Sequence, residues 1–403
     1  MTYLLKNARL LDAELNHAPL DLLVDGETIC AVGTELGPAD QVIDLTGYTL
    51  LPGFVDAHVH VAVNDHAFQS DAVNAWVYNG VTTVRELGML STLPQQDYAQ
   101  WLLKNNQNPD AAHVVASGKY IDVAGGYGAG PMPNHPVGNL ITTPQEAADA
   151  VTQAHALGFP GIKIGIHDGT MDTTPHLTPE MAKAICDRAH ELHMWVAAHI
   201  GNCRGARFML DAGVDELAHT PSDPMPEDMI QEMAEKGIVM DTTVGDPDKG
   251  MEPPPMPDLQ EGMEPPEGMG PPPGPRMPMD PAEMKRQQAE KMKIMEENLG
   301  RFYRAGGKIV VGTDLIHSRD YRKDAVIPVP ELRHLSAAGL PLQAILRAAT
   351  LSGAEVLGTT EGRIAPGYLA NLVAVPGPVD ETFDALRQVK MVMHRGHVIR
   401  NER

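Results

Sequence analysis

Eight short β-type runs alternate with helical patterns through the middle of the chain, and this alternation limits the possible folds more than any other feature. Strands separated by helices form a parallel sheet, because a parallel connection has to cross over one face of that sheet. Eight such units favour an α/β fold of the (β/α)8 TIM-barrel type over an open sheet. The runs cover residues 54–61, 81–87, 113–120, 161–166, 195–200, 215–220, 237–243 and 307–314.

Helix-end signals between the runs support this arrangement. In TPQEAADAVTQAHALG, Thr143 or Pro144 is typical of a helix start and Gly158 of a helix end. The segment TPEMAKAICDRAHELH has the same Thr-Pro start. Both segments are therefore predicted to be helices that connect strands of the barrel.

The two ends of the chain differ from its middle. The first fifty residues predict hairpins, and the tail predicts short strands in LANLVAV and VKMVMHRGHVI. We expect both ends to pair into one small β-sandwich domain, built from residues 1–50 and 359–403, beside a barrel at residues 51–358. A chain of 403 residues is long enough for one large and one small domain.

Pro, Met, Gly and acidic residues dominate an insertion at residues 245–281, in which GMEPP occurs twice. This composition cannot sustain a helix or strand, so we expect a long loop. The loop follows the seventh run on the barrel face where active sites are built, which makes a lid one interpretation. A tolerated surface insertion is the second, because long loops cost little closure entropy. Methionine ligation of copper(I) is a third, which the acidic neighbours disfavour.

The composition indicates a small-molecule substrate. A formal net charge of −22 opposes encounter with nucleic acid or with an anionic membrane. The three cysteines, Cys30, Cys186 and Cys203, are widely spaced and odd in number, which predicts neither a disulfide framework nor a thiolate zinc site. No stretch reaches membrane-spanning length, and the first residues lack an apolar signal segment. We therefore expect a cytoplasmic protein, and a homo-oligomer stays open.

Two histidines, His58 and His60, flank one valine at the end of the first run. Side chains two apart on a strand share a face, so both imidazoles can reach one metal ion. Alone, either this pair or any single later histidine is also compatible with a hydrogen-bonded core position. The ends of parallel strands converge at one mouth of a barrel, however, and further polar residues lie at or near such ends. They are Lys163, His199, His219 and Asp314.

The chain resembles the amidohydrolase superfamily of metal-dependent hydrolases over nearly its whole length apart from the insertion. The matching stretches are LLPGFVDAHVH, GVTTVREL, GIKIG, VAAHI, DELAHT, VGTD and PLQAILRAATLSGAEVLGTTEGRIAPGYLANLVAV. The spacing is most similar to the branch of prolidase-like (Xaa-Pro dipeptidase) and imidazolonepropionase-like hydrolases.

The resemblance implies two zinc ions. His58, His60 and Asp314 would bind the more buried ion and His199 and His219 the more exposed one. Two cations repel an ammonium, so Lys163 has to be either neutral or converted by CO2 to a carbamate. The resemblance favours the carbamate as the bridge. It also implies a metal-bridging hydroxide that attacks a carbonyl, with Asp314 as the general base.

The sequence departs from the dipeptidase pattern at Tyr127, where GGYG stands in place of the family's GGHG. A phenol donates hydrogen bonds but does not become cationic, so recognition of an anionic substrate is altered. Other expected substrate contacts lie just beyond strand ends, where loop residues often carry function, although a solvated position is the plain alternative. They are His167, Arg204 and His317, with His135 a weaker candidate. Arg85 is expected to support the barrel through an ion pair.

Three functions remain open on the sequence. The leading hypothesis is a binuclear zinc amide hydrolase, peptidase-like, acting on a dipeptide-like or N-acyl amino acid substrate. The second is a mononuclear imidazolonepropionase-like hydrolase of cyclic amides with an unmodified Lys163. The third, a non-catalytic barrel that binds a partner, is disfavoured because all six ligand types are present.

Overall fold

The computed structural model describes residues 1–14, 16–61, 70–89, 91, 93–129, 138–166, 171–172, 175–247, 280–316, 323 and 325–403. The candidates His135, His167 and His317 lie outside the described residues, as does most of the insertion at residues 245–281.

Two parallel sheets form the middle of the chain. One has the order β11-β12-β13-β14-β15 and the other the order β16-β6-β7-β8, and every neighbouring pair in them is parallel. All eight predicted runs contain one of these strands, and the alternation with helices fits a TIM-type barrel. The strands are β6 (Phe54–His60), β7 (Val81–Glu86), β8 (His113–Ala116), β11 (Gly161–Gly165), β12 (Trp195–His199), β13 (Glu216–Leu217), β14 (Val239–Asp241), β15 (Lys308–Val310) and β16 (Leu315–Ile316).

Backbone hydrogen bonds join the two sheets along one seam. The amide of Ala57 in β6 donates to the carbonyl of Val311, just after β15, at 2.8 Å. The amide of Asp314 donates to the carbonyl of His58, also at 2.8 Å. The last turn of chain after β15 therefore lies directly against the histidine-bearing end of β6.

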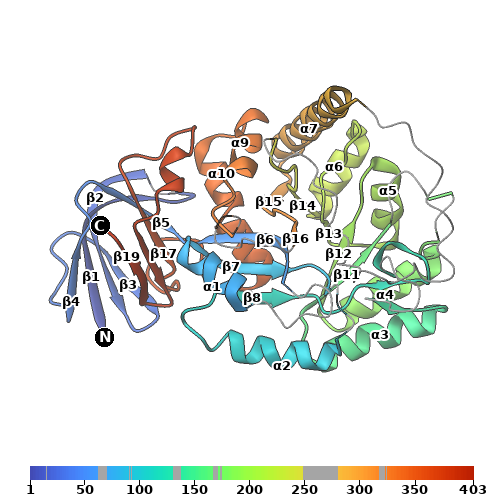
Figure 1. The fold of residues 1–403 in the computed structure, drawn as a ribbon, viewed down its shortest axis with the longest axis horizontal. Coiled ribbons are helices and arrows are strands. Elements are labelled where there is room, and N and C mark those ends of the chain that lie inside the picture. The colour runs from blue at the N-terminus through green and yellow to red at the C-terminus, as the bar shows by residue number, and fades with distance from the viewer. Residues whose placement is uncertain are drawn as a thin grey trace, which may run out of the picture.

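Helices lie on the outside of the parallel strands (Figure 1). The two helices predicted from Thr-Pro starts are confirmed, because Thr143 and Thr178 cap them by accepting hydrogen bonds from Glu146 N and Met181 N. Gly158, with φ +87°, follows the end of the first of them. The helices are α1 (Ser70–Tyr78), α2 (Gln95–Asn105), α3 (Pro144–Ala156), α4 (Pro179–Glu191), α5 (Cys203–Ala212), α6 (Glu227–Lys236), α7 (Pro281–Arg304), α9 (Val329–Ala337), α10 (Leu342–Ala348) and α11 (Leu351–Leu357).

The two ends of the chain share one eight-stranded sheet, seen in Figure 1 as blue strands beside dark red ones. Its order is β19-β18-β17-β5-β1-β2-β3, with β4 paired to β1. The N-terminal and C-terminal parts meet where β5 and β17 pair antiparallel. The strands are β1 (Thr2–Leu11), β2 (Asn16–Asp25), β3 (Thr28–Gly33), β4 (Gln41–Asp44), β5 (Tyr48–Pro52), β17 (Leu372–Pro376), β18 (Met391–His394) and β19 (His397–Asn401).

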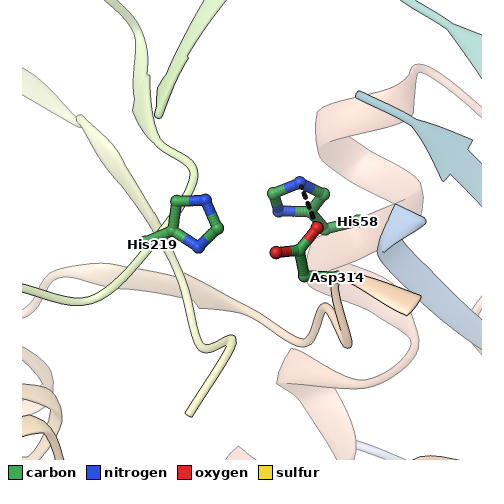
Figure 2. Close-up of side chains that lie close together, drawn as sticks. All are labelled: His58, His219 and Asp314. Carbon is green, nitrogen blue, oxygen red and sulfur yellow. Dashed lines mark ion pairs between the residues drawn. The ribbon is translucent and has the colours of Figure 1, made fainter. Parts of the chain in front are cut away.

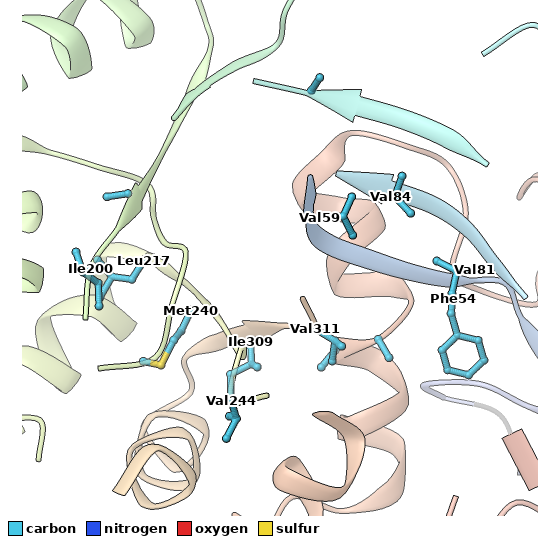
Figure 3. Close-up of a cluster of buried hydrophobic side chains, with 14 of the residues drawn as sticks. Phe54, Val59, Val81, Val84, Ile200, Leu217, Met240, Val244, Ile309 and Val311 are labelled. Carbon is cyan, nitrogen blue, oxygen red and sulfur yellow. The ribbon is translucent and has the colours of Figure 1, made fainter. Parts of the chain in front are cut away.

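A continuous apolar core packs between the parallel strands and their helices. Phe54, Val59, Val84 and Val311 are buried members of it (Figure 3). All seven residues of β6 are buried, as expected for a parallel strand covered on both faces. None of the described helices is both long enough and apolar enough to cross a membrane.

A buried ion pair joins strands of the two parallel sheets. Arg85 of β7 donates from Nη1 to Glu216 Oε2 of β13 at 2.8 Å, and its Nη2 contacts the other carboxylate oxygen. Its Nε donates to the carbonyl of Ala57 at 2.7 Å, and its guanidinium lies 5.1 Å from the ring centroid of Trp195. Both charged side chains are almost fully buried. The expected structural ion pair of Arg85 is confirmed.

Replacement of Arg85 should be strongly destabilising. Arg85→Ala leaves the carboxylate of Glu216 buried without its partner, so we expect the free energy of unfolding to fall by about 3 to 5 kcal/mol. Arg188→Ala is the matched control, because its ion pair with Glu191 is at the surface and should contribute less than about 1 kcal/mol. Urea unfolding of both variants measures the difference. Equal losses would show that Arg85 does not stabilise the fold through its buried pair.

Candidate metal centre

The seam between the two sheets brings three predicted ligands together. His60 Nε2 lies 3.0 Å from Asp314 Oδ1, and His58 Nε2 lies 3.4 Å from the same oxygen. Asp314 has a backbone φ of +51°, which is uncommon for a non-glycine residue and typical of functional sites. The alternation of side chains on β6 and the turn after β15 therefore aim two rings and one carboxylate at a common point.

Two further histidines complete the group from neighbouring strands. The ring centroid of His219 lies 5.0 Å from that of His58 and 4.3 Å from that of His199. One ligand atom each from His58, His219 and Asp314 falls within 4.8 Å of the others, and Figure 2 shows these three side chains facing one another. The structure therefore brings together His58 and His219, which lie 161 positions apart in the sequence.

The outer ring nitrogens of these histidines already have hydrogen-bond partners. His58 Nδ1 lies 3.0 Å from the carbonyl of Ala218, and His60 Nδ1 lies 3.2 Å from the carbonyl of Gly88. A carbonyl only accepts, so both Nδ1 atoms carry the proton. In the neutral ring of His58, Nε2 is then an acceptor, and it faces the Asp314 carboxylate. Two acceptors that face each other in this way are the chemistry that a cation satisfies.

Burial and neighbouring charges set the protonation of the rings. Burial, followed by nearby cationic groups, lowers the pKa of His58 and of His219 well below the usual value, so both rings are neutral near pH 7. Burial also lowers the pKa of His60, but hydrogen bonds to Asp314 and Glu86 outweigh it and raise the pKa to about 9. A metal ion would have to displace that proton from His60.

Lys163, in the middle of β11, is buried and points its amine at the same region. Within the described part of the chain its Nζ has no hydrogen-bond partner. Burial lowers the pKa of the amine to about 8, although Asp314 and Glu216 oppose this shift. About a tenth of the amine is therefore neutral and nucleophilic at pH 7, far more than for an ordinary lysine.

Asp56, which sequence reasoning missed, holds the turn that carries Asp314. Its two oxygens accept hydrogen bonds from the amide and the hydroxyl of Thr313 at 3.1 and 2.7 Å. The amide of His58 donates to it at 3.2 Å. Burial raises the pKa of Asp56 to about 7. Asp56 lies two residues before His58 on the same strand, so the alternation of side chains that paired His58 with His60 also points to Asp56.

Asp241, at the end of β14, is a second missed carboxylate. It is fully buried, and within the described residues neither oxygen has a hydrogen-bond partner. Its Oδ2 lies 3.2 Å from His58 Nδ1, at ion-pair distance. Burial, followed by the charge of Glu216, raises the pKa of Asp241 well above its usual range. The rule that found the other candidates, a polar residue at the carboxyl end of a run, also points to Asp241.

The expected substrate contacts fall into two groups. The ring of Tyr127 stacks on the ring of His199, with centroids 3.9 Å apart, and lies beside the candidate ligands. Arg204 is 62% exposed and forms a bidentate ion pair with Asp172, at 2.6 and 2.9 Å. A substrate that used Arg204 would compete with this pair. The two remaining contacts, His167 and His317, lie outside the described residues.

Comparison with known proteins assigns the chain to a family. The model of the Amidohydrolase family matches residues 49–399, which include every candidate ligand. The chain belongs to the amidohydrolase family. The suspected resemblance is thus confirmed, and solved structures of related amidohydrolases and prolidases share its fold.

The curated relatives of this amidohydrolase match it in part. A dihydroorotase of Pediococcus pentosaceus is 28% identical over 40% of this chain and 41% of its own length. An allantoinase of Salmonella paratyphi B is 36% identical over 19% of this chain and 17% of its own length. The chain therefore spans less than half the length of these relatives.

Solved structures match the fold over almost the full chain. A Xaa-Pro dipeptidase with bound methionine in the active site aligns with a TM-score of 0.75 at 22% identity, over 99% of both chains. A putative prolidase from Bifidobacterium longum aligns with a TM-score of 0.74 at 23% identity, over 98% of this chain and 94% of its own. The ochratoxinase of A. niger aligns with a TM-score of 0.75 at 18% identity, over 99% of this chain and 96% of its own.

A side chain at Gly312 should disrupt the centre. A Cβ there would lie 2.6 Å from the Cβ of His58 and closer still to the carboxylate of Asp241. We expect Gly312→Ala to lower the free energy of unfolding by about 1 to 3 kcal/mol and to reduce metal retention, because His58 has to move. Gly37→Ala, where a Cβ meets nothing within 4 Å, is the control and should change stability by less than about 0.5 kcal/mol. Thermal unfolding and metal analysis measure both effects, and native metal content in Gly312→Ala would contradict the expectation.

Proposed function

We propose that this amidohydrolase is a metal-dependent enzyme that hydrolyses a carbon–nitrogen bond in a dipeptide-like or N-acyl amino acid substrate. The observation that carries the proposal is the convergence of unprotonated ring nitrogens and the Asp314 carboxylate on one partly buried point. Membership of the amidohydrolase family supports hydrolysis as the chemistry. The prolidase and dipeptidase structures that share the fold support a peptide-like substrate class.

The residues at the centre fit two zinc ions. His58, His60 and Asp314 would hold the more buried ion, and His199 and His219 the other. Imidazole nitrogen and carboxylate oxygen are usual zinc ligands. The amine of Lys163 is buried, has no hydrogen-bond partner among the described residues and acts electrostatically on both His58 and His219, so Lys163 is the residue that would bridge the ions. Its depressed pKa favours loss of the ammonium proton, and the neutral amine can then add to CO2, which forms an N–C bond and releases a second proton to give an anionic carbamate.

When bound, zinc would supply Lewis-acid polarisation of a carbonyl and a lowered pKa for water. The remaining work falls to side chains of this chain. Asp314 has one oxygen within 3.4 Å of both His58 and His60, and its side chain is 31% exposed, so it can take a proton from water and return it to the leaving nitrogen. Tyr127, at the open side of His199, would contact the substrate as a neutral hydrogen-bond donor.

Four broader features belong to the same proposal. We infer that the two parallel sheets close into one (β/α)8 barrel, which the seam hydrogen bonds of Ala57 and Asp314 support. We infer that the sheet shared by the chain ends is part of a β-sandwich domain. The strong negative charge supports a small-molecule partner rather than nucleic acid or a membrane. The cysteine pattern supports the cytoplasm.

A mononuclear cyclic-amide hydrolase is the second candidate. It is favoured by one observation, because only His58, His219 and Asp314 among the described residues form a group with ligand atoms within 4.8 Å. Three protein ligands with an open fourth position suffice for one catalytic zinc ion. Lys163 would then remain an unmodified amine.

Metal analysis and a substrate panel test the proposal together. Native protein loaded with zinc should contain about two ions per chain and hydrolyse members of a panel of dipeptides, N-acyl amino acids and cyclic amides. Lys163→Ala should retain fewer ions and lose at least about 100-fold in kcat/KM, since the bridge is gone. Lys183→Ala is the control, because Lys183 is exposed and paired with Asp187. One ion that persists in Lys163→Ala would favour the mononuclear candidate, and no hydrolysis by the zinc-loaded native protein would favour a non-catalytic barrel.

The carbamate predicts a defined pH dependence. Because the pKa of Lys163 is lowered from 10.5 to about 8, its neutral, CO2-reactive form is scarce at low pH and grows as pH rises through about 8. Incorporation of 13C-bicarbonate into the metal-free protein should therefore rise from about pH 7 to about pH 9. Carbon NMR detects the carbamate signal, which should be missing from Lys163→Ala. An identical signal in that variant would assign the carbamate to another amine.

A further inference from the structure

Thr243 adopts a strained backbone conformation two residues after the end of β14. Its φ is +38°, a value that is a genuine outlier for a β-branched residue. Such strain persists only where the surrounding structure over-determines it, and it clusters at functional positions. The conformation therefore calls for an explanation in terms of what the Thr243 side chain contacts.

Hydrogen bonds on both sides of Thr243 impose this conformation. The amides of Thr242 and Thr243 donate to the carbonyls of Val310 and Gly312 at 3.1 and 3.2 Å. Beyond Thr243, the amides of Val244 and Gly245 donate to the two oxygens of one buried carboxylate. That carboxylate belongs to Glu331 of α9, at 3.1 and 2.7 Å. The chain at Thr243 is thus fixed between the end of β15, with the residues that follow it, and helix α9.

The strained backbone directs the Thr243 hydroxyl at His219. Thr243 Oγ1 lies 2.8 Å from His219 Nδ1. The other ring nitrogen of His219, Nε2, is buried and has no hydrogen-bond partner within the described residues. A ligand atom of His219 also belongs to the group with His58 and Asp314. The ring is therefore held from behind by one hydroxyl, with its second nitrogen turned toward the candidate metal centre.

We propose that Thr243 is a positioning residue that fixes the tautomer and the orientation of His219. Its hydroxyl oxygen accepts the Nδ1 proton of His219, which leaves Nε2 as an unprotonated ligand atom directed at the centre. The turn after β14 would thus orient a ring that the turn after β13 supplies. The backbone strain at Thr243 is retained because an unstrained residue there would not bring its hydroxyl to the ring. The ligand role of His219 rests on the proposed function, whereas the tautomer does not.

Paired threonine variants separate this role from general stability. Thr243→Val keeps the β-branched shape and removes the hydroxyl, and Thr243→Ser restores the hydroxyl. Thr242→Val is the matched control, because the buried Thr242 hydroxyl forms hydrogen bonds with the backbone of Gly312 and, among the described residues, none with a histidine. All three can lower the melting temperature, but only Thr243→Val should change the ring of His219.

The first measurement is the nitrogen-15 spectrum of the histidine rings in metal-free protein, with His219 assigned by the signal missing from His219→Gln. Native protein, Thr243→Ser and Thr242→Val should all show a protonated Nδ1 and an unprotonated Nε2 on His219. Thr243→Val should show a mixture of tautomers. A native His219 with its proton on Nε2 overturns the proposal even if every variant fails to fold.

The second measurement is zinc affinity by competition with a chromophoric chelator. Thr243→Val should bind zinc about 10- to 100-fold more weakly than native protein, as is typical when the partner of a ligating histidine is lost. Thr243→Ser and Thr242→Val should stay within about threefold of native protein. Native affinity in a folded Thr243→Val overturns the proposal. Failure of the native protein to bind zinc would instead refute the proposed function and leave the tautomer result standing.

Discussion

The hydrogen bond from the Asp314 amide to the His58 carbonyl is the contact on which the candidate metal centre depends. It joins the two parallel sheets where β6 ends in His58-Val59-His60 and where the chain after β15 reaches Asp314, whose backbone φ is +51°. Asp56 reinforces the same junction by accepting hydrogen bonds from Thr313 and from the His58 amide. A shift of the sheets along this seam would separate the rings from the carboxylate, so the fold and the chemistry share one constraint.

Buried histidines around this seam are hydrogen-bonded on their outer sides, whereas some polar atoms on their inner side have no partner. His58 and His60 use Nδ1 on backbone carbonyls, and His219 uses Nδ1 on a hydroxyl. On the inner side, the amine of Lys163 and Nε2 of His219 lack hydrogen-bond partners among the residues that the structure describes. An unpaired buried polar atom is costly, and metal ions with a bridging group would satisfy several of these atoms at once.

Much of the candidate centre could be predicted from the sequence, for reasons that are local. Strand periodicity placed His58 and His60 on one face, and the convergence of parallel strands linked them to His219 and Asp314. Asp241 ends a strand, so the rule that found the other candidates applies to it as well, whereas the role of Thr243 depends on the side chain that its neighbours direct at it. The substrate role of Arg204 stays a prediction, and its ion pair with Asp172, 32 positions earlier, could not be read from the sequence. Contacts between distant loops leave no periodic signal in the sequence.

The sequence by itself determined the alternation of strands and helices, the positions of the helix caps and the residue types gathered at the strand ends, since these follow from periodicity and backbone preference. The tertiary structure decided which ring nitrogen faces inward, which carboxylates are buried and where the backbone is strained. Those properties depend on hydrogen-bond partners that come from other strands, such as Ala218 for His58 and Thr243 for His219. Only folding brings these partners within hydrogen-bond distance, so the protonation of each ring is a property of the folded chain rather than of the local sequence.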